Sequence, residues 1–126
     1  MKRREAREKA VQTLFQLDNT ELTIEEAITY IVDEPANAFY EQLVRGTVQH
    51  LASIDETLVG KLEHWSLDRL PKIERTVLRL AVYELLFNEE VPHRVVLNEA
   101  IELCKTFGDE KSGRFVNGVL SKFEEK

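Results

Sequence analysis

Cysteine, glycine and proline are scarce in this chain of 126 residues, which has one, five and three of them respectively. The single cysteine, Cys104, excludes an internal disulfide bond. Its place in the apolar pattern of Ile101, Leu103 and Phe107 is typical of a small buried hydrophobic residue. Strict alternation of apolar and polar residues is also missing, so the sequence does not predict a β-sheet.

The motifs of common metal and enzyme sites are missing too. His50, His64 and His93 stand alone, and there is no second cysteine to complete a zinc site. The chain contains no glycine-rich nucleotide-binding motif and no Gly-x-Ser-x-Gly nucleophile motif. We therefore expect no catalytic residue, no metal and no cofactor.

The sequence shows neither an apolar leader segment nor an uninterrupted membrane span. The chain is charged from its second residue, and its longest apolar segment is interrupted by Lys72, Glu74, Arg75 and Arg79. We expect a cytoplasmic protein that does not enter the membrane.

Charge is plentiful but unevenly placed. The net charge is −6, yet the first nine residues contain five cations and two carboxylates, a net +3, so the other 117 residues total −9. A mostly acidic body disfavours indiscriminate binding to nucleic acid, whereas a local basic end can hold a few phosphates.

Apolar residues recur at spacings of three and four, which predicts α-helices. We expect about seven, at residues 3–17, 24–32, 36–52, 53–64, 70–88, 93–107 and 112–123. Thr23 and Ser53 begin capping-box patterns, and Ser112 is the predicted N-cap of the last helix. Gly46, in the middle of a helix, indicates a close helix crossing. The prediction is an all-α fold, a single domain over residues 1–126 in which two sub-bundles share a central helix.

Residues 70–88 form the predicted central helix, because they are apolar nearly all round and must be covered on several sides. Lys72, Glu74, Arg75 and Arg79 are expected to form its exposed strip. Glu84 instead shares a face with apolar residues, so it needs a hydrogen-bond partner. We expect a structural role for it, such as capping the N–H groups of another helix.

Two interpretations of the basic N-terminal segment remain open. Cations in the first turns of a helix oppose its macrodipole, so helix stability does not explain them. Arg3 and Arg7 fall in line with the apolar stripe of the first helix, and we expect them to project past the end of the core. A frayed, solvated terminus and a surface that binds RNA or phosphate both account for this pattern.

The residues at the start of the predicted last helix also allow two interpretations. Lys111 and Arg114 flank Phe115, which lies beside the apolar stripe of that helix. An aromatic ring next to two cations suits stacking on an unpaired base while its phosphate is held. A partly buried phenylalanine with solvated neighbours is the simpler alternative.

Three stretches resemble one known family when they are considered together. They are AREKAVQTLFQ near the start, ERTVLRLAVYELLF in the centre and VVLNEAIELCKTFGDEKSGRFVNGVLSK near the end. Their order and spacing resemble the bacterial NusB family over essentially the whole chain. The resemblance implies an all-α fold of two helical bundles and a non-enzymatic role in transcription antitermination. It also implies binding to the boxA element of ribosomal RNA transcripts together with the ribosomal protein NusE, alongside other Nus factors on RNA polymerase.

The resemblance also implies roles for particular residues. The predicted RNA-binding residues are Lys2, Arg3, Arg4, Arg7, Gln12, Lys111, Arg114 and Phe115. The predicted partner-binding residues are Glu74, Arg75 and Arg79. Phe15 replaces the tyrosine often found in the first helix, and Glu5 interrupts the basic run, which weakens phosphate binding. The two basic segments form one RNA surface if the first and last helices pack together.

Alternatives to this interpretation remain. The chain can instead be an adaptor whose protein partner holds most of the RNA. A NusB-like domain also precedes the cofactor-binding domain of some ribosomal RNA methyltransferases, but no such cofactor-binding segment is seen here, so an enzyme is not favoured. Self-association is left open, since some family members form homodimers.

Overall fold

The computed structural model describes residues 1–33 and 37–123. Within them the chain forms seven α-helices and one short 3₁₀ helix, and no strand. The helices are α1 (Arg3–Leu17), α2 (Ile24–Ile31), α3 (Ala38–Gln49), α4 (Leu51–Lys61), η1 (Leu67–Arg69), α5 (Lys72–Phe87), α6 (His93–Phe107) and α7 (Glu110–Leu120). The all-α prediction is confirmed. The predicted start of the third helix at Ala36 lies outside the described residues.

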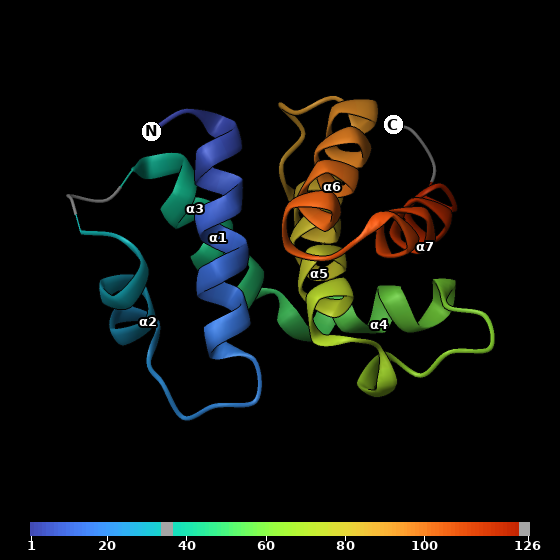
Figure 1. Cartoon of the computed structure of the whole chain (residues 1–126), viewed down its shortest axis with the longest axis horizontal. Helices are drawn as coiled ribbons and strands as arrows, with labels where there is room; N and C mark the ends of the chain where they lie inside the picture. Colours follow the sequence, from blue (N-terminus) through green and yellow to red (C-terminus); the bar gives the residue numbers. More distant parts are fainter. Residues whose placement is uncertain (34–36, 124–126) are drawn as a thin grey trace.

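The central helix and the two sub-bundles are also as predicted. Helix α5 packs against α1 and α3 on one side and against α4, α6 and α7 on the other. Figure 1 shows α1, α2 and α3 grouped on the left and α4 and α7 on the right, with α5 between the two groups and α6 in front of α5. Because α5 is covered from both sides, its apolar residues need no single buried face.

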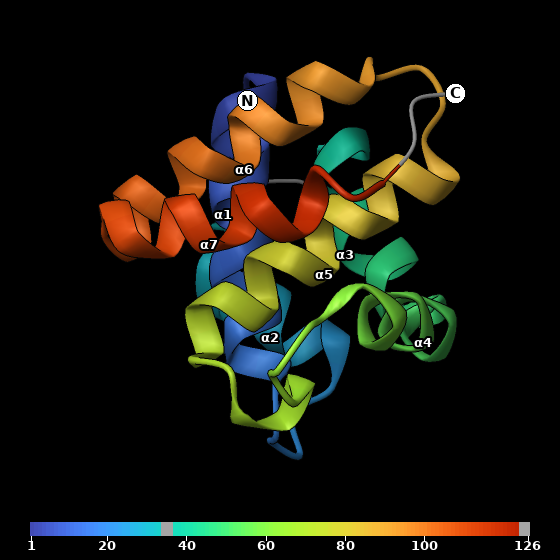
Figure 2. The same cartoon turned by 90° about the vertical axis from the view of Figure 1, so that its right-hand side faces the viewer.

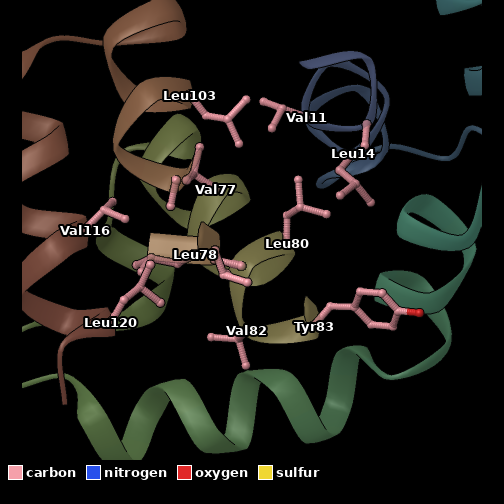
Figure 3. Close-up of a cluster of buried hydrophobic side chains, with 14 of the residues drawn as sticks. Val11, Leu14, Val77, Leu78, Leu80, Val82, Tyr83, Leu103, Val116 and Leu120 are labelled. Atoms are coloured by element: carbon pink, nitrogen blue, oxygen red, sulfur yellow. The ribbon is translucent and has the colours of Figure 1, made fainter. Parts of the chain in front are cut away.

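Side chains from α1, α6 and α7 meet those of α5 in the core. Figure 3 shows the labelled core residues Val11, Leu14, Val77, Leu78, Leu80, Val82, Tyr83, Leu103, Val116 and Leu120. All of them are buried. Burying an aliphatic side chain of this size stabilises a fold by about 1.5–3 kcal/mol, so this shared core accounts for the packing of both sub-bundles on one helix.

Gly46 marks the close helix crossing that its position predicts. It lies in α3 opposite Tyr83 of α5, and a Cβ atom at this position would meet the tyrosine ring. The glycine therefore lets α3 approach α5 closely enough to pack on it, at the cost of a weak helix former.

Two predicted helix starts are wrong. Helix α3 ends at Gln49 and α4 begins at Leu51, so the break falls at His50 and not at Ser53. The turn at His50 lets Ile54 and Leu58 of α4 become fully buried, and this packing outweighs the local capping pattern. The last helix is capped by Asp109, whose Oδ1 accepts a hydrogen bond of 2.8 Å from the Ser112 N–H. Ser112 therefore lies inside the first turn.

Other local predictions are confirmed. Thr23 and Glu26 form a reciprocal capping box at α2, with both hydrogen bonds 3.1 Å long. Cys104 is fully buried, and burial raises the pKa of its thiol to about 12, so the reactive thiolate is not formed near neutral pH. None of the described helices is both long and apolar enough to cross a membrane.

Candidate nucleic-acid and partner interface

Three cations are exposed at the N-terminal end of α1, and we call Lys2, Arg3 and Arg4 the basic tip. The Arg3 guanidinium lies 4.5 Å from the ring centroid of Phe39 in α3, a cation–π contact that orients Arg3 while leaving it exposed. The tip is thus held against a second helix, which argues against a frayed terminus.

Arg4 is exposed but already paired. Its Nη2 and Nε donate to the Glu99 carboxylate of α6 at 2.7 and 3.3 Å. The Arg4 side chain is 63% exposed, so the pair is accessible to solvent and ligands. The hydrogen bond with Glu99 raises the pKa of Arg4. A phosphate that binds Arg4 must therefore compete with an internal carboxylate.

Arg7 does not project past the core as predicted. Its side chain is 4% exposed, and its Nε and Nη2 donate to the two carboxylate oxygens of Glu84 at 2.8 and 2.9 Å. Its Nη1 also lies 3.5 Å from Glu99. Burial by itself lowers the pKa of Arg7, but the bond and charge of Glu84 outweigh it, so the pKa is raised. Direct RNA contact by Arg7 would require this pair to break.

The same pair supplies the hydrogen-bond partner that Glu84 was expected to need. Its side chain is 2% exposed, and its hydrogen-bond partner is the Arg7 guanidinium rather than the N–H groups of a helix end. The role is structural, as expected, but the expectation of helix capping is wrong.

Gln12 lies in an apolar groove of about 650 Å³ between α1 and the start of α5, which we call the α1–α5 groove. Its walls are Val11, Gln12, Phe15, Gln16, Ile31, Pro71, Lys72, Ile73 and Phe107. The Lys72 ammonium lies 4.4 Å from the Phe15 ring centroid, so a cation and an exposed ring face the same groove. Sequence reasoning missed Lys72 as a groove residue.

Lys111 and Phe115 lie in a second groove, of about 220 Å³, which we call the Trp65 groove. It is lined by Trp65, Leu70, Pro71, Glu74, Asp109, Lys111, Ser112 and Phe115. The Glu74 carboxylate accepts a hydrogen bond of 3.0 Å from the Ser112 hydroxyl. The predicted partner-binding acid and two predicted RNA-binding residues thus share one groove.

Trp65 is a residue of this groove that sequence reasoning missed. It is 58% exposed, and its ring meets the Phe115 ring edge-on, with centroids 5.9 Å apart. The one tryptophan of the chain, placed in the predicted corner between two helices, was the available signal.

Arg75 and Arg79 form internal contacts instead of an exposed strip, so that expectation is wrong for both. Arg75 bonds Asp18 at 2.7 and 2.9 Å and also donates to backbone carbonyls around η1. Arg79 bonds Asp55 of α4 at 2.8 and 2.9 Å and lies 3.4 Å from Asp18. Their side chains are 11% and 16% exposed. Partner binding by either arginine stays a prediction.

The first and last helices do not form a packed pair. Helix α7 packs on α6 and α5, and Figures 1 and 2 show these two helices between α1 and α7. The basic tip and the Lys111–Phe115 segment are therefore separate surfaces. The α1–α5 groove and the Trp65 groove are adjacent, however, because Pro71 lines both.

The described residues suit binding rather than metal chemistry. Across residues 1–33 and 37–123, no three His, Cys, Asp or Glu side chains are grouped so that they could hold a metal ion. Exposed cations, aromatic rings and apolar grooves define an all-α protein of the binding class, with surfaces of the chemistry that nucleic acids and protein partners require.

Comparison with known proteins identifies the family within that class. A family model described as the NusB family matches residues 4–125, and the chain belongs to the NusB family. The family expected from the three sequence stretches is confirmed.

The relatives and solved structures agree with this assignment. The chain is 71% identical to the transcription antitermination protein NusB of Lysinibacillus sphaericus, over 100% of this chain and 99% of that protein. It is 50% identical to the Bacillus subtilis protein of that name, over 96% and 93% of the two chains. T. maritima NusB superposes with a TM-score of 0.88 and 38% identity, over 97% of this chain and 89% of that chain. A crystal structure of the antitermination factors NusB and NusE in complex with double-stranded RNA gives a TM-score of 0.84 and 35% identity, over 94% and 92%.

The buried Arg7–Glu84 pair gives the first prediction. Glu84→Gln should lower the free energy of unfolding by about 3 kcal/mol, because removing one charge leaves the other buried without full compensation. Arg7→Met should cost a similar amount, because the buried Glu84 carboxylate then has no cation beside it. The double variant Arg7→Met/Glu84→Gln should cost much less than the two single changes together, because neither buried charge is then left alone.

Urea denaturation of all four proteins measures this double-mutant cycle. Strictly additive losses would show that the two side chains act independently and would contradict the pair.

Proposed function

We propose that this NusB-family chain acts in transcription antitermination by binding boxA-type RNA together with a NusE-type ribosomal protein. The observation that carries the proposal is the basic tip, three exposed cations on a chain whose net charge is −6. The similar NusB–NusE complex solved with RNA supports it. The chain would act on transcripts in the cytoplasm with other Nus factors and RNA polymerase, by binding and not by catalysis.

The RNA affinity of the chain alone should be weak. Lys2, Arg3 and Arg4 supply local positive charge, but the acidic remainder of the protein opposes the approach of a polyanion. Arg4 must also break its hydrogen bond to Glu99 before it can bind a phosphate. A basic protein partner would supply further cations, so the complex should bind RNA more tightly than either protein does.

The aromatic rings favour single-stranded RNA. Trp65 and Phe115 meet at the Trp65 groove beside Lys111, and unpaired bases can stack on such rings whereas paired bases cannot. Titrations should therefore include a single strand and a duplex of the same sequence, since the similar complex was solved with double-stranded RNA.

The Trp65 groove also favours a second candidate function, that of an adaptor whose partner holds most of the RNA. Glu74 and Asp109 place two carboxylates beside an exposed tryptophan, which suits a basic side chain of a protein partner. Arg75 would serve this site indirectly, because it holds the corner around η1 next to the groove.

The basic tip gives the second prediction. RNA binding by the unmodified chain should weaken with salt at a slope of about −3 in log K against log[salt], as expected for about four phosphates on a single strand. The double variant Arg3→Ala/Arg4→Ala should bind more weakly and reduce the slope by about 1 to 1.5. Fluorescence anisotropy at several salt concentrations measures both quantities.

The matched control removes the same charge elsewhere. Arg45→Ala/Lys122→Ala lowers the net charge equally, at exposed positions of α3 and the C-terminal turn. If it weakens RNA binding as much as the tip variant does, net charge and not the tip controls affinity.

Phe115 gives the third prediction and separates the two candidate functions. Phe115→Ala should weaken binding of single-stranded RNA while leaving affinity for a NusE-type protein unchanged, because the ring offers a stacking surface. Isothermal titration with each ligand alone tests this. Loss of protein binding with unchanged RNA binding would favour the adaptor.

Glu99 gives the fourth prediction. Glu99→Gln removes the carboxylate that competes for Arg4, so it should tighten RNA binding by up to about fivefold, the range for an exposed ion pair. Glu56→Gln, an equal charge change at an exposed position of α4, should have a smaller effect. RNA binding that weakens in Glu99→Gln would mean that Glu99 orients Arg4 for RNA instead of competing with it.

A further inference from the structure

A small cleft between α6 and α7 brings Arg114, a predicted RNA-binding residue, together with side chains to which no role has been given. It measures about 200 Å³ and is lined by Ile101, Lys105, Glu110, Gly113, Arg114 and Asn117. Its α7 residues lie on a different face of that helix from Lys111 and Phe115, which line the Trp65 groove. We call it the α6–α7 cleft.

The charged groups of the cleft are available to a ligand. Arg114 is exposed and forms no ion pair with any described residue. Lys105 is 52% exposed and lies 3.6 Å from Glu102, a weak contact one turn away on its own helix. Glu110 also lines the cleft, so the net charge of the lining is +1, in a protein whose total charge is −6. A local positive charge on an acidic body suits one phosphate group.

Asn117 adds a polar group that the fold does not use. It is partly buried in the cleft wall, and its side-chain amide makes no hydrogen bond to another described residue. A carboxamide both donates and accepts hydrogen bonds, so it can bind a hydroxyl group such as the ribose 2′-OH.

Gly118, the next residue, has no structural reason to be glycine. It lies inside α7 with a negative φ, and a Cβ atom there would meet no atom within 4 Å. Glycine is a poor helix former, so alanine would suit this helix better. A helical glycine that faces open space does, however, allow the backbone of another molecule to approach closely. Gly118 is one turn from Arg114 and does not line the cleft; it lies on the strip of α7 between the cleft and the face of Lys111 and Phe115, where a strand that runs from one to the other would pass.

We propose that the α6–α7 cleft binds a segment of RNA backbone, with Lys105 and Arg114 on a phosphate, Asn117 on a ribose hydroxyl and Gly118 leaving room for the strand. This inference rests on the proposed RNA-binding function and extends it around α7 from Phe115. The two cations and the amide would also suit an acidic peptide; the neighbouring Phe115, a ring on which an unpaired base can stack, favours RNA.

The sharpest test compares two exposed helical glycines. Gly118→Ala should raise the melting temperature by a few degrees, because it removes a poor helix former, and should weaken RNA binding by roughly threefold or more. Gly60 in α4 also faces open space, so Gly60→Ala should raise the melting temperature without changing RNA affinity. Gain of stability with loss of binding is a combination that a purely structural glycine would not produce.

Two further variants test the proposed contacts to the phosphate and to the ribose hydroxyl. Lys105→Gln should reduce the magnitude of the salt slope for single-stranded RNA by about 0.7, the value for one phosphate. Asn117→Ala should lower the ratio of affinities for single-stranded RNA and DNA of the same sequence, because the 2′-OH contact is lost.

The outcomes separate this inference from the proposed function. Suppose that Arg3→Ala/Arg4→Ala weakens RNA binding but Gly118→Ala and Lys105→Gln bind RNA as the unmodified chain does. The inference about the α6–α7 cleft is then overturned and the proposed function stands. If the unmodified chain shows no salt-dependent RNA binding, the proposed function itself fails. If Gly118→Ala weakens binding of a NusE-type protein and not of RNA, the cleft is a protein surface and the inference is overturned.

Discussion

A buried ion pair ties the first helix to the centre of this fold. Arg7 of α1 and Glu84 of α5 are almost fully removed from solvent, and each satisfies the other through two hydrogen bonds. In a low-dielectric interior neither charge can be left alone, so the pair fixes the position of α1 along α5. Glu99 of α6 lies beside the same arginine, which brings a third helix to this point. The basic tip depends on this arrangement, because Arg4 lies one turn from Arg7 and reaches the same glutamate.

A second ionic network holds the other end of α1. Asp18, directly after the helix, bonds Arg75 and lies close to Arg79, which in turn bonds Asp55 of α4. Helix α1 is therefore held against α5 at both ends by charged groups, while its middle, around Gln12, borders the α1–α5 groove. The apolar groove of about 650 Å³ is therefore bordered by two helices whose relative position is fixed by both networks.

The helices and the core could be predicted from sequence because periodic burial is a local property. The failures concern contacts between distant residues. The pattern placed Arg7 on the apolar face of its helix and showed that Glu84 needed a partner, but nothing local to either residue reveals a pair 77 positions apart. Ser53 carried a correct capping pattern, yet packing of Ile54 and Leu58 moved the break to His50. Trp65 follows Leu58 and Leu62 at helical spacing, which suggests burial, so its exposure beside Phe115 emerged only from the fold.

The separation of the surfaces has a consequence for how RNA and protein would act together. The basic tip and α7 lie on opposite sides of α5 and α6, and the Trp65 groove, with Glu74 and Lys111 in it, lies beside the start of α5. A basic protein in this groove would neutralise carboxylates that otherwise repel an RNA strand on α7. It would also hold its own cations near that strand, which raises their effective concentration. Cooperation between the two ligands thus requires no change of shape, because it follows from the carboxylates in the groove that α7 itself lines.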